Sequence, residues 1–433
     1  MRHRSALPTA AALVAAALTL TACGSRDSGN AGSSANGSGP GQGGSTVVIG
    51  FDGPLTGDLS ALALGARNAA ELAVRQANEK NLVPGVTFKL EALDDLAQPS
   101  NGQQNATKFV ADDRVLGVVG PLNSSVAQSM QKVFDQAKLA AVSPSTTNPA
   151  LTQGENWASG DKKRPFASYF RTATTDDVQG PFAAQYMKND LAKGKVFVVD
   201  NKKAYGAGLA STFKAEFTRI GGQVVGEDHI NSGEKDFSAV VTKIRTSGAE
   251  AVYFGGEYAD SGLFTDQLKK SGAQIPLMGG DGMNDAKYIQ LANGNGEGDY
   301  ATSVGAPVEA LPSAKDFVAA YGQGGFKEPY GGYGGYSYDA VSALIQAVKA
   351  TVEGNGGKLP GDARAKVLAA LQKVAFDGVT GRVSFDEFGD TTNKQLTVYQ
   401  VKGGQWAPVK SGELTVGNAG ASAGAPAQGG TPQ

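Results

Sequence analysis

Hydroxyl and amide side chains follow two apolar strands predicted in the first half of the chain. Ser124 comes shortly after the apolar run 115–119, and Thr146 and Thr147 follow the short strand predicted at 140–143. Hydroxyls and the free N–H groups of a helix N-terminus bind an anion without adding a second formal charge. These residues are therefore candidate ligands for a carboxylate. A structural alternative remains open, in which Asn123 or Ser124 caps a helix and the threonines belong to a polar turn.

Acidic and aromatic side chains follow three strands predicted in the second half. Tyr205 follows the strand at 195–199, Glu257 or Tyr258 follows the strand at 251–254, and Asp281 follows the strand at 276–278. Carboxylates and aromatic rings bind an ammonium group through charge and through cation–π contact. Here too an alternative remains open, in which Asp281 serves a turn and Glu257 lies on a solvated surface.

The two groups of side chains have opposite polarity. In open parallel sheets, ligands bind beyond the carboxyl ends of the strands, where both groups are expected to lie. The first half would hold a negative group and the second half a positive one. A zwitterion bound between the halves would satisfy both, because a buried acid without a partner is costly.

Strands and helices alternate through most of the chain. Short apolar or β-branched runs predict the strands, and apolar residues at helical spacing predict the helices. The predicted strands lie at 46–51, 86–93, 115–119, 140–143, 195–199, 224–228, 251–254, 276–278 and 300–303, and the predicted helices at 62–78, 103–111, 124–136, 205–220, 237–247, 260–271, 313–321, 338–352 and 362–374. This alternation predicts an α/β fold with two doubly wound parallel sheets. The runs at 383–385 and 395–401 are expected to close as antiparallel strands, and the Gly- and Tyr-rich stretch 330–338 is expected to pack rather than bind.

The two ends of the chain carry the marks of export and tethering. Residues 1–22 predict a signal peptide, with Arg2 and Arg4 before a short apolar stretch at 10–20. The only cysteine, Cys23, comes directly after this segment and resembles the lipidated residue of bacterial lipoproteins. An ordinary signal peptide followed by an accidental cysteine is the alternative. Residues 23–45 predict the lipidated cysteine and a flexible tether, and residues 414–433 predict a disordered tail.

Composition excludes several classes of protein. The 433 residues include one cysteine and two histidines, which rules out an internal disulfide and argues against a Cys/His metal site. Thirty-nine basic and 41 acidic residues give a net charge of −2, without the basic excess that nucleic-acid binding needs. The sequence lacks the G-x-S-x-G, H-E-x-x-H and P-loop motifs. We therefore expect no enzymatic activity, no cofactor, no metal and no nucleic-acid partner.

A series of short motifs between residues 46 and 410 resembles a known family in combination. The family is that of the branched-chain amino-acid (Leu/Ile/Val) binding proteins of ABC importers, which have the type I periplasmic binding fold. The matching motifs are Gly53–Gly57, Asp94–Asp95, Gly120–Leu122, Ser143–Pro149, Tyr205–Leu209, Lys235–Ser238, Gly255–Gly256, Gly280–Gly282, Tyr338–Val341 and Phe385–Asp390. No single motif would suffice.

The resemblance implies two lobes joined by three hinge crossings, with the ligand in the cleft between them. The crossings are expected near 172–176, 302–306 and 376–382. Lobe 1 would comprise residues 46–173 plus 304–378, and lobe 2 residues 174–303 plus 379–413.

The resemblance also implies roles for the candidate residues. Ser124, Thr146 and Thr147 would hold the ligand carboxylate, while Tyr205 and Asp281 would face it from the other lobe, with Asp281 near the ammonium. Leu62 and Glu257 stand where the family often has an aromatic residue. Glu257 thus adds a second acid near the cleft, so a polar or cationic amino acid or an amide becomes a plausible ligand.

The function implied by the resemblance is the capture of an amino acid outside the cytoplasm by hinge closure and its delivery to an ABC permease. The protein would be a monomer, held at the membrane by lipid on Cys23. Two alternatives stay open: a membrane-tethered ligand sensor of the same fold, and a binder of amide- or urea-type solutes.

Overall fold

The computed structural model describes residues 44–414. The predicted signal peptide, Cys23 and nearly all of the predicted tail lie outside the described residues. Within 44–414, no helix combines the length and the apolar character needed to cross a membrane.

A five-stranded parallel sheet forms the centre of one lobe, which we call the five-stranded lobe. Its strands lie in the order β2-β1-β3-β4-β5. They are β1 (Ser45–Gly53), β2 (Val86–Asp94), β3 (Val115–Val119), β4 (Ala140–Ser143) and β5 (Tyr169–Arg171). The helices of this lobe are α1 (Ser60–Glu79), α2 (Pro99–Ala111), α3 (Ser124–Gln136), α4 (Ala150–Gln153), α10 (Lys315–Gln323), α11 (Gly334–Glu353) and α12 (Ala363–Leu371), with short 3-10 turns η1 (Trp157–Ser159), η4 (Val308–Ala310) and η5 (Pro312–Ala314).

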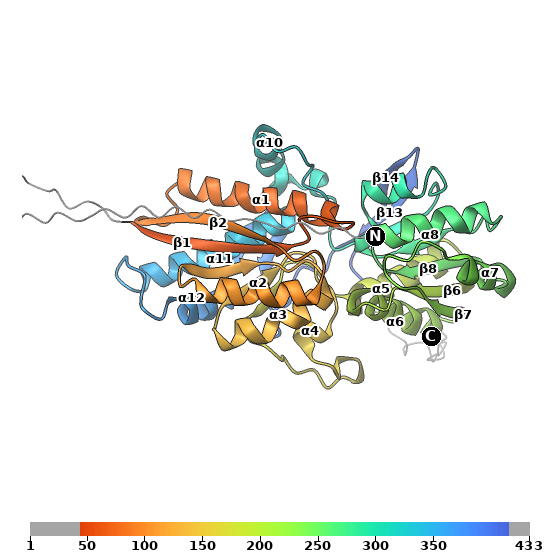
Figure 1. The fold of residues 1–433 in the computed structure, drawn as a ribbon, viewed down its shortest axis with the longest axis horizontal. Coiled ribbons are helices and arrows are strands. Elements are labelled where there is room, and N and C mark those ends of the chain that lie inside the picture. Colours follow the sequence, from red (N-terminus) through yellow and green to blue (C-terminus); the bar gives the residue numbers. More distant parts are fainter. Residues whose placement is uncertain (1–43, 415–433) are drawn as a thin grey trace, which may run out of the picture. The chain divides into compact units, whose positions relative to one another are not determined.

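Helices cover both faces of this sheet, which explains why the central strands β3 and β4 are buried along their whole length (Figure 1). Successive side chains of β1 point to opposite faces. Val47 and Ile49 belong to the same apolar cluster as α1 and α11, whereas Val48 packs in a second cluster with Phe109 of α2 and Met130 of α3.

A seven-stranded sheet forms the centre of the second lobe, the seven-stranded lobe. Its order is β14-β13-β10-β9-β8-β6-β7. The strand β13 pairs antiparallel with both β10 and β14, and all other neighbouring strands pair in parallel. The strands are β6 (Lys195–Asp200), β7 (Gln223–His229), β8 (Ala251–Gly255), β9 (Leu277–Gly279), β10 (Tyr300–Ser303), β13 (Leu396–Lys402) and β14 (Gln405–Gly412). Its helices are α5 (Asp176–Gln185), which continues as the π-helical turn η2 (Tyr186–Asp190), α6 (Ala204–Arg219), α7 (Ser238–Ser247), α8 (Tyr258–Lys270), the 3-10 turn η3 (Asp281–Met283) and α9 (Ala286–Leu291).

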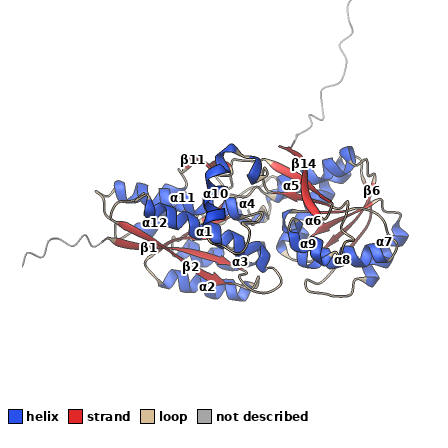
Figure 2. Ribbon diagram, turned by 90° about the horizontal axis from the view of Figure 1, so that it is seen from above, coloured by secondary structure: helices blue, strands red, loops and turns tan. Residues whose placement is uncertain are grey.

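Alternation again divides the apolar residues of this sheet between two helical layers (Figure 2). Val198 and Tyr253 pack with Phe213 of α6, where the rings of Tyr253 and Phe213 are stacked with centroids 3.6 Å apart. Val199 and Phe254 face the layer formed by α7 and α8. The expected α/β fold with two doubly wound sheets is confirmed.

The chain passes between the two sheets three times. It leaves the five-stranded lobe after β5 and enters α5, and it returns after β10 towards η4. A hairpin of β11 (Ala375–Gly378) and β12 (Gly381–Ser384) precedes the third passage into β13.

The segment after the hairpin bears on the third passage, which the family resemblance implied near 376–382. The Phe385 ring packs against Phe170, and Asp390 forms an ion pair with Arg171, so this segment still contacts the five-stranded lobe. On these contacts we propose that the third crossing lies at 392–395 instead of 376–382. The other lobe boundaries stay as predicted.

Candidate functional site

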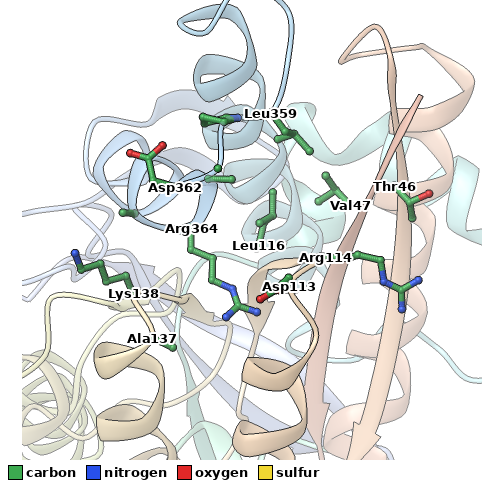
Figure 3. A pocket seen from close by; sticks show the side chains of 14 residues that line it. Thr46, Val47, Asp113, Arg114, Leu116, Ala137, Lys138, Leu359, Asp362 and Arg364 are labelled. Carbon is green, nitrogen blue, oxygen red and sulfur yellow. The ribbon is translucent and has the colours of Figure 1, made fainter. Parts of the chain in front are cut away.

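One sizeable cavity in the described residues is not placed for a ligand of these sheets. It has a volume of about 580 Å³ and lies at the amino ends of β1 and β3, beside Thr46, Asp113 and Arg364 (Figure 3). Ligands of parallel sheets bind at the opposite, carboxyl ends. The Arg364 guanidinium is already engaged, because it donates to four backbone carbonyls, among them those of Val115 and Asp112.

A second, much smaller cavity lies at the carboxyl ends of strands from both sheets. It measures about 20 Å³, enough for about one water molecule. Both lobes contribute to its lining, which consists of Leu62, Leu122, Asn123, Ser124, Ser145, Tyr205, Glu257, Asp281, Gly282 and Tyr333. Four of the six predicted ligand-binding residues therefore share one cavity.

Asp281 is held at this cavity by donors from both lobes. The hydroxyl of Tyr205 donates to Asp281 Oδ1 over 2.8 Å, and the side-chain amide of Gln179 donates to the same oxygen over 2.9 Å. The hydroxyl of Tyr333, from the five-stranded lobe, donates to Asp281 Oδ2 over 2.7 Å. The carboxyl group is thus fixed in position by neutral donors alone.

Burial raises the pKa of Asp281, and the three hydrogen bonds from Tyr333, Gln179 and Tyr205 oppose that rise. A second buried acid, Asp176 at the start of α5, lies close behind it. Burial, followed by the charge of Asp281, raises the pKa of Asp176 well above its ordinary value. Gln179 donates to both carboxyl groups, since its Nε2 lies 3.1 Å from Asp176 Oδ1. The seven-stranded lobe therefore holds two buried carboxyl groups here, linked through Gln179.

Glu257 provides a second carboxylate at the cavity. It is buried at the start of α8, directly after β8. Asn201 donates to its Oε2 over 2.7 Å from the same lobe, and Asn123 donates to its Oε1 over 3.3 Å from the other lobe. Among the described residues that line the cavity, none is a lysine or an arginine.

Two glycines allow the acidic loop to approach its neighbours. A Cβ atom at position 280 would lie 2.5 Å from the hydroxyl oxygen of Tyr205, and one at position 282 would lie 2.9 Å from a carbon of the same ring. The Gly280–Gly282 motif therefore lets Asp281 sit directly against Tyr205. The backbone N–H of Gly282 also donates to that hydroxyl over 3.0 Å.

The predicted anion-binding residues occupy two different environments. Ser124, at the N-terminus of α3, lines the cavity, and its hydroxyl is buried without a hydrogen-bond partner. Thr147 lies outside the cavity lining, and its hydroxyl is buried without a hydrogen-bond partner. It faces Asp176 and partly offsets the rise in the pKa of that acid. Thr146 turns into the five-stranded lobe, where its hydroxyl and that of Tyr169 are 2.9 Å apart. The structure thus brings Ser124, but not Thr146, to the cavity shared with Asp281.

Further hydrogen bonds join the lobes around the cavity. Asn148 donates to the carbonyl of Ala204 over 2.6 Å, and the N–H of Ala204 donates to the Ser125 hydroxyl over 3.2 Å. The Tyr258 hydroxyl, at the start of α8, donates to the carbonyl of Asp58 over 2.6 Å. These hydrogen bonds hold the two lobes together around the cavity that Asp281 and Glu257 line.

Reasoning from the sequence missed several residues of this site. Tyr333 belongs to the stretch 330–338 that was expected only to pack. Tyr330 and Tyr338 do pack against Phe317, but Tyr333 reaches the cavity instead. Gln179 lies on α5, which the sequence pattern did not predict, so no positional signal pointed to it.

Other features of the described residues give no sign of metal chemistry. Residues 44–414 contain no group of three or more His, Cys, Asp or Glu side chains that could hold a metal ion. The Nδ1 atom of His229, at the edge of the seven-stranded sheet, lies 2.7 Å from Asp200 Oδ2. Its ring is half exposed and distant in sequence from the cavity residues.

Comparison with known sequences identifies relatives along nearly the whole described chain. A family model described as periplasmic binding protein matches residues 46–405. An amino acid binding protein of Pseudomonas aeruginosa is 34% identical over 358 residues, which cover 82% of this chain and 90% of that protein. The Leu/Ile/Val-binding protein homolog 2 of Brucella abortus is 31% identical over 359 residues, covering 83% and 91%.

Solved structures with the same architecture agree with these relatives. The leucine binding protein LivK of Thermotoga maritima superposes with a TM-score of 0.74 at 27% identity, covering 84% of this chain and 98% of that one. The branched-chain amino acid transporter substrate binding protein LivJ of Streptococcus pneumoniae, solved in complex with isoleucine, gives 0.75 at 25% identity and covers 85% and 99%.

Proposed function

The chain belongs to the periplasmic binding protein family, and from this premise we propose that it captures an amino acid outside the cytoplasm and delivers it to an ABC permease. Relatives named as amino acid and Leu/Ile/Val-binding proteins support the ligand class. The regions that match these relatives cover more than four fifths of this chain, so they include both lobes. Members of this family bind solutes, and we propose a binding role rather than a catalytic one here.

One observation carries the proposal. Two buried carboxylates of the seven-stranded lobe, Asp281 and Glu257, face the unpartnered hydroxyl of Ser124 across one cavity. An ammonium group would compensate Asp281, and a carboxylate would accept from Ser124 and the N–H groups that open α3. An α-amino acid carries both groups on one carbon, so the opposed polarities suit it.

Opening and closing of the lobes would control access. A cavity of about 20 Å³ is too small for an amino acid, so binding requires the lobes to separate. A ligand that contacts Asp281 and Ser124 together does so only when the lobes are closed, and it therefore shifts the population towards the closed form. The closed form would be the one that the permease recognises.

Isothermal titration calorimetry with the free amino acids tests the ligand class. We expect binding by at least one amino acid, and we expect the variant Asp281→Asn to bind it more than about tenfold more weakly, since a charge-assisted bond is lost. Asp281→Asn keeps the shape of the side chain, so its thermal unfolding should stay close to that of the wild type. An unchanged affinity in this variant would remove Asp281 from the site.

We further propose that lipid on Cys23 anchors the protein to the outer face of the cytoplasmic membrane or to another envelope membrane. The position of the single cysteine directly after a signal-peptide pattern supports this assignment. Two acyl chains hold a protein stably, whereas one chain is marginal. Labelled palmitate should enter the wild-type protein and not Cys23→Ser; equal labelling of both would contradict the anchor.

A further inference from the structure

The α-amino and carboxylate groups of a ligand would leave one acid of the cavity unused. The ammonium compensates Asp281 and the carboxylate is taken up by Ser124, but Glu257 also lines the cavity. Its carboxylate is buried, and the side-chain groups that donate to it are neutral amides. A buried carboxylate with only neutral donors is expensive unless a ligand supplies a further donor or a positive charge.

Glu257 lies on the same wall of the cavity as Asp281. Gly282 separates them, and a Cβ atom at that position would lie 3.4 Å from Glu257 Cγ and 2.9 Å from a ring carbon of Tyr205. Tyr205 in turn holds Asp281. A ligand whose ammonium reaches Asp281 would therefore place its side chain beside Glu257.

A second acceptor lies in the cavity beside Glu257. Asn123 lines the same space from the five-stranded lobe, and its Oδ1 is buried without a hydrogen-bond partner. Its Nδ2 donates to Glu257, so the free oxygen lies next to the carboxylate. Two neighbouring acceptors, one charged and one neutral, match a group with more than one N–H.

We propose that Glu257 and Asn123 select an amino acid whose side chain ends in N–H donors, as an ammonium, a guanidinium or a carboxamide does. This proposal rests on the proposed function, because it assumes that Asp281 and Ser124 hold the α-amino and carboxylate groups. A purely aliphatic side chain would leave both acceptors buried and unpaired. Sites built to bond an N–H discriminate strongly against analogues that lack it.

The test is a calorimetric comparison of arginine, lysine, glutamine and asparagine with leucine and isoleucine, using the full-length protein. At least one donor-bearing amino acid should bind about tenfold or more tightly than leucine. Glu257→Leu should weaken that ligand about tenfold or more and leave leucine unchanged or tighter. Glu257→Gln keeps the size and polarity of the side chain, so it separates loss of charge from failure to fold.

The matched control is Glu353→Gln, an exposed acid that lies 3.9 Å from Lys349 at the end of α11 opposite to Tyr333. It should change no affinity. Equal or tighter binding of leucine or isoleucine by the wild type would overturn the proposal, and so would an equal loss of all ligands in Glu257→Gln. Absence of binding by every amino acid would instead contradict the proposed function.

Discussion

At the scale of single residues, the described chain keeps several carboxyl groups in its interior without a cation. Asp52, near the end of β1, and Asp95, just after β2, are both fully buried, and each has one carboxyl oxygen without a donor. Asn105 donates to the other oxygen of Asp52 over 2.9 Å. A proton shared between the two carboxyl groups would supply the missing donor.

The pH dependence of stability should report this shared proton. Burial raises the pKa of Asp95 from 3.8 to about 6, and burial together with the charge of Asp95 raises that of Asp52. At pH values between the unfolded and the folded pKa of these groups, the folded state binds more protons than the unfolded state. The free energy of unfolding should therefore fall as the pH rises from about 4 to above 6. Asp52→Asn should flatten this fall, as measured by urea unfolding at several pH values.

The control for this series is Asp377→Asn, an exposed acid paired with Arg382 on the hairpin. It should leave the pH profile unchanged. An Asp52→Asn profile that matches the wild type would show that the two buried acids do not share a proton.

At the scale of elements, one ion pair ties the first and third passages between the sheets to a loop of the candidate site. Arg171, the last residue of β5, and Asp390 are both fully buried, and Arg171 Nη2 lies 2.7 Å from Asp390 Oδ1. Arg171 also donates to the carbonyls of Thr146 and Asn148, over 3.3 and 2.7 Å. It therefore positions the loop that carries Thr147.

Breaking this pair should cost stability. Removal of one partner leaves the other charge buried, which costs about 3–5 kcal/mol. We expect Arg171→Met and Asp390→Asn each to lower the free energy of unfolding by about this amount, and the double variant to lose less than the sum. Urea unfolding measures all three, and strictly additive losses would contradict a direct pairing.

The sequence predicted the bounds of elements well where a buried apolar run ends at turn residues. The strand at 115–119, the helix at 124–136 and the strand at 140–143 have the predicted bounds, because apolar runs and turn residues mark their ends. The strand β5 was missed, since it has three residues and ends in the charged Arg171. The helix α5 was missed as well, because Gly180 and Pro181 disfavour a helix in any pattern.

The candidate site was predictable to the extent that it depends on strand ends. Ser124 follows a strand of the five-stranded sheet, whereas Tyr205, Glu257 and Asp281 follow strands of the seven-stranded sheet. Topology therefore places each of the four at the carboxyl edge of its own sheet. Tyr333 follows no strand and comes from a distant part of the chain. Its contact with Asp281 depends on how the lobes meet, which a local pattern does not encode.

At the scale of the whole molecule, the lobes are joined by contacts that do not touch the cavity. The Tyr258 hydroxyl donates to the Asp58 carbonyl and accepts from the N–H of Ala61 over 3.3 Å. Tyr258 is absent from the cavity lining. Such a bond would favour closure without contacting the ligand.

Tyr258→Phe should therefore weaken ligand binding only by destabilising the closed form, because no contact with the ligand is removed. Loss of about 1 kcal/mol from the closed form corresponds to about fivefold lower affinity. Calorimetry with the best amino acid measures this change. Tyr300→Phe is the matched control, because its hydroxyl accepts from Gln400 within the seven-stranded lobe. Equal effects of the two variants would show that the Tyr258 bond has no special part in closure.

The most direct measurement is a crystal structure of the protein with the amino acid that it binds most tightly. The account predicts that the ligand lies between the lobes, with its ammonium within hydrogen-bond distance of Asp281 and its carboxylate accepting from Ser124. A ligand that contacts one lobe only, or that turns its carboxylate towards Asp281, would contradict it.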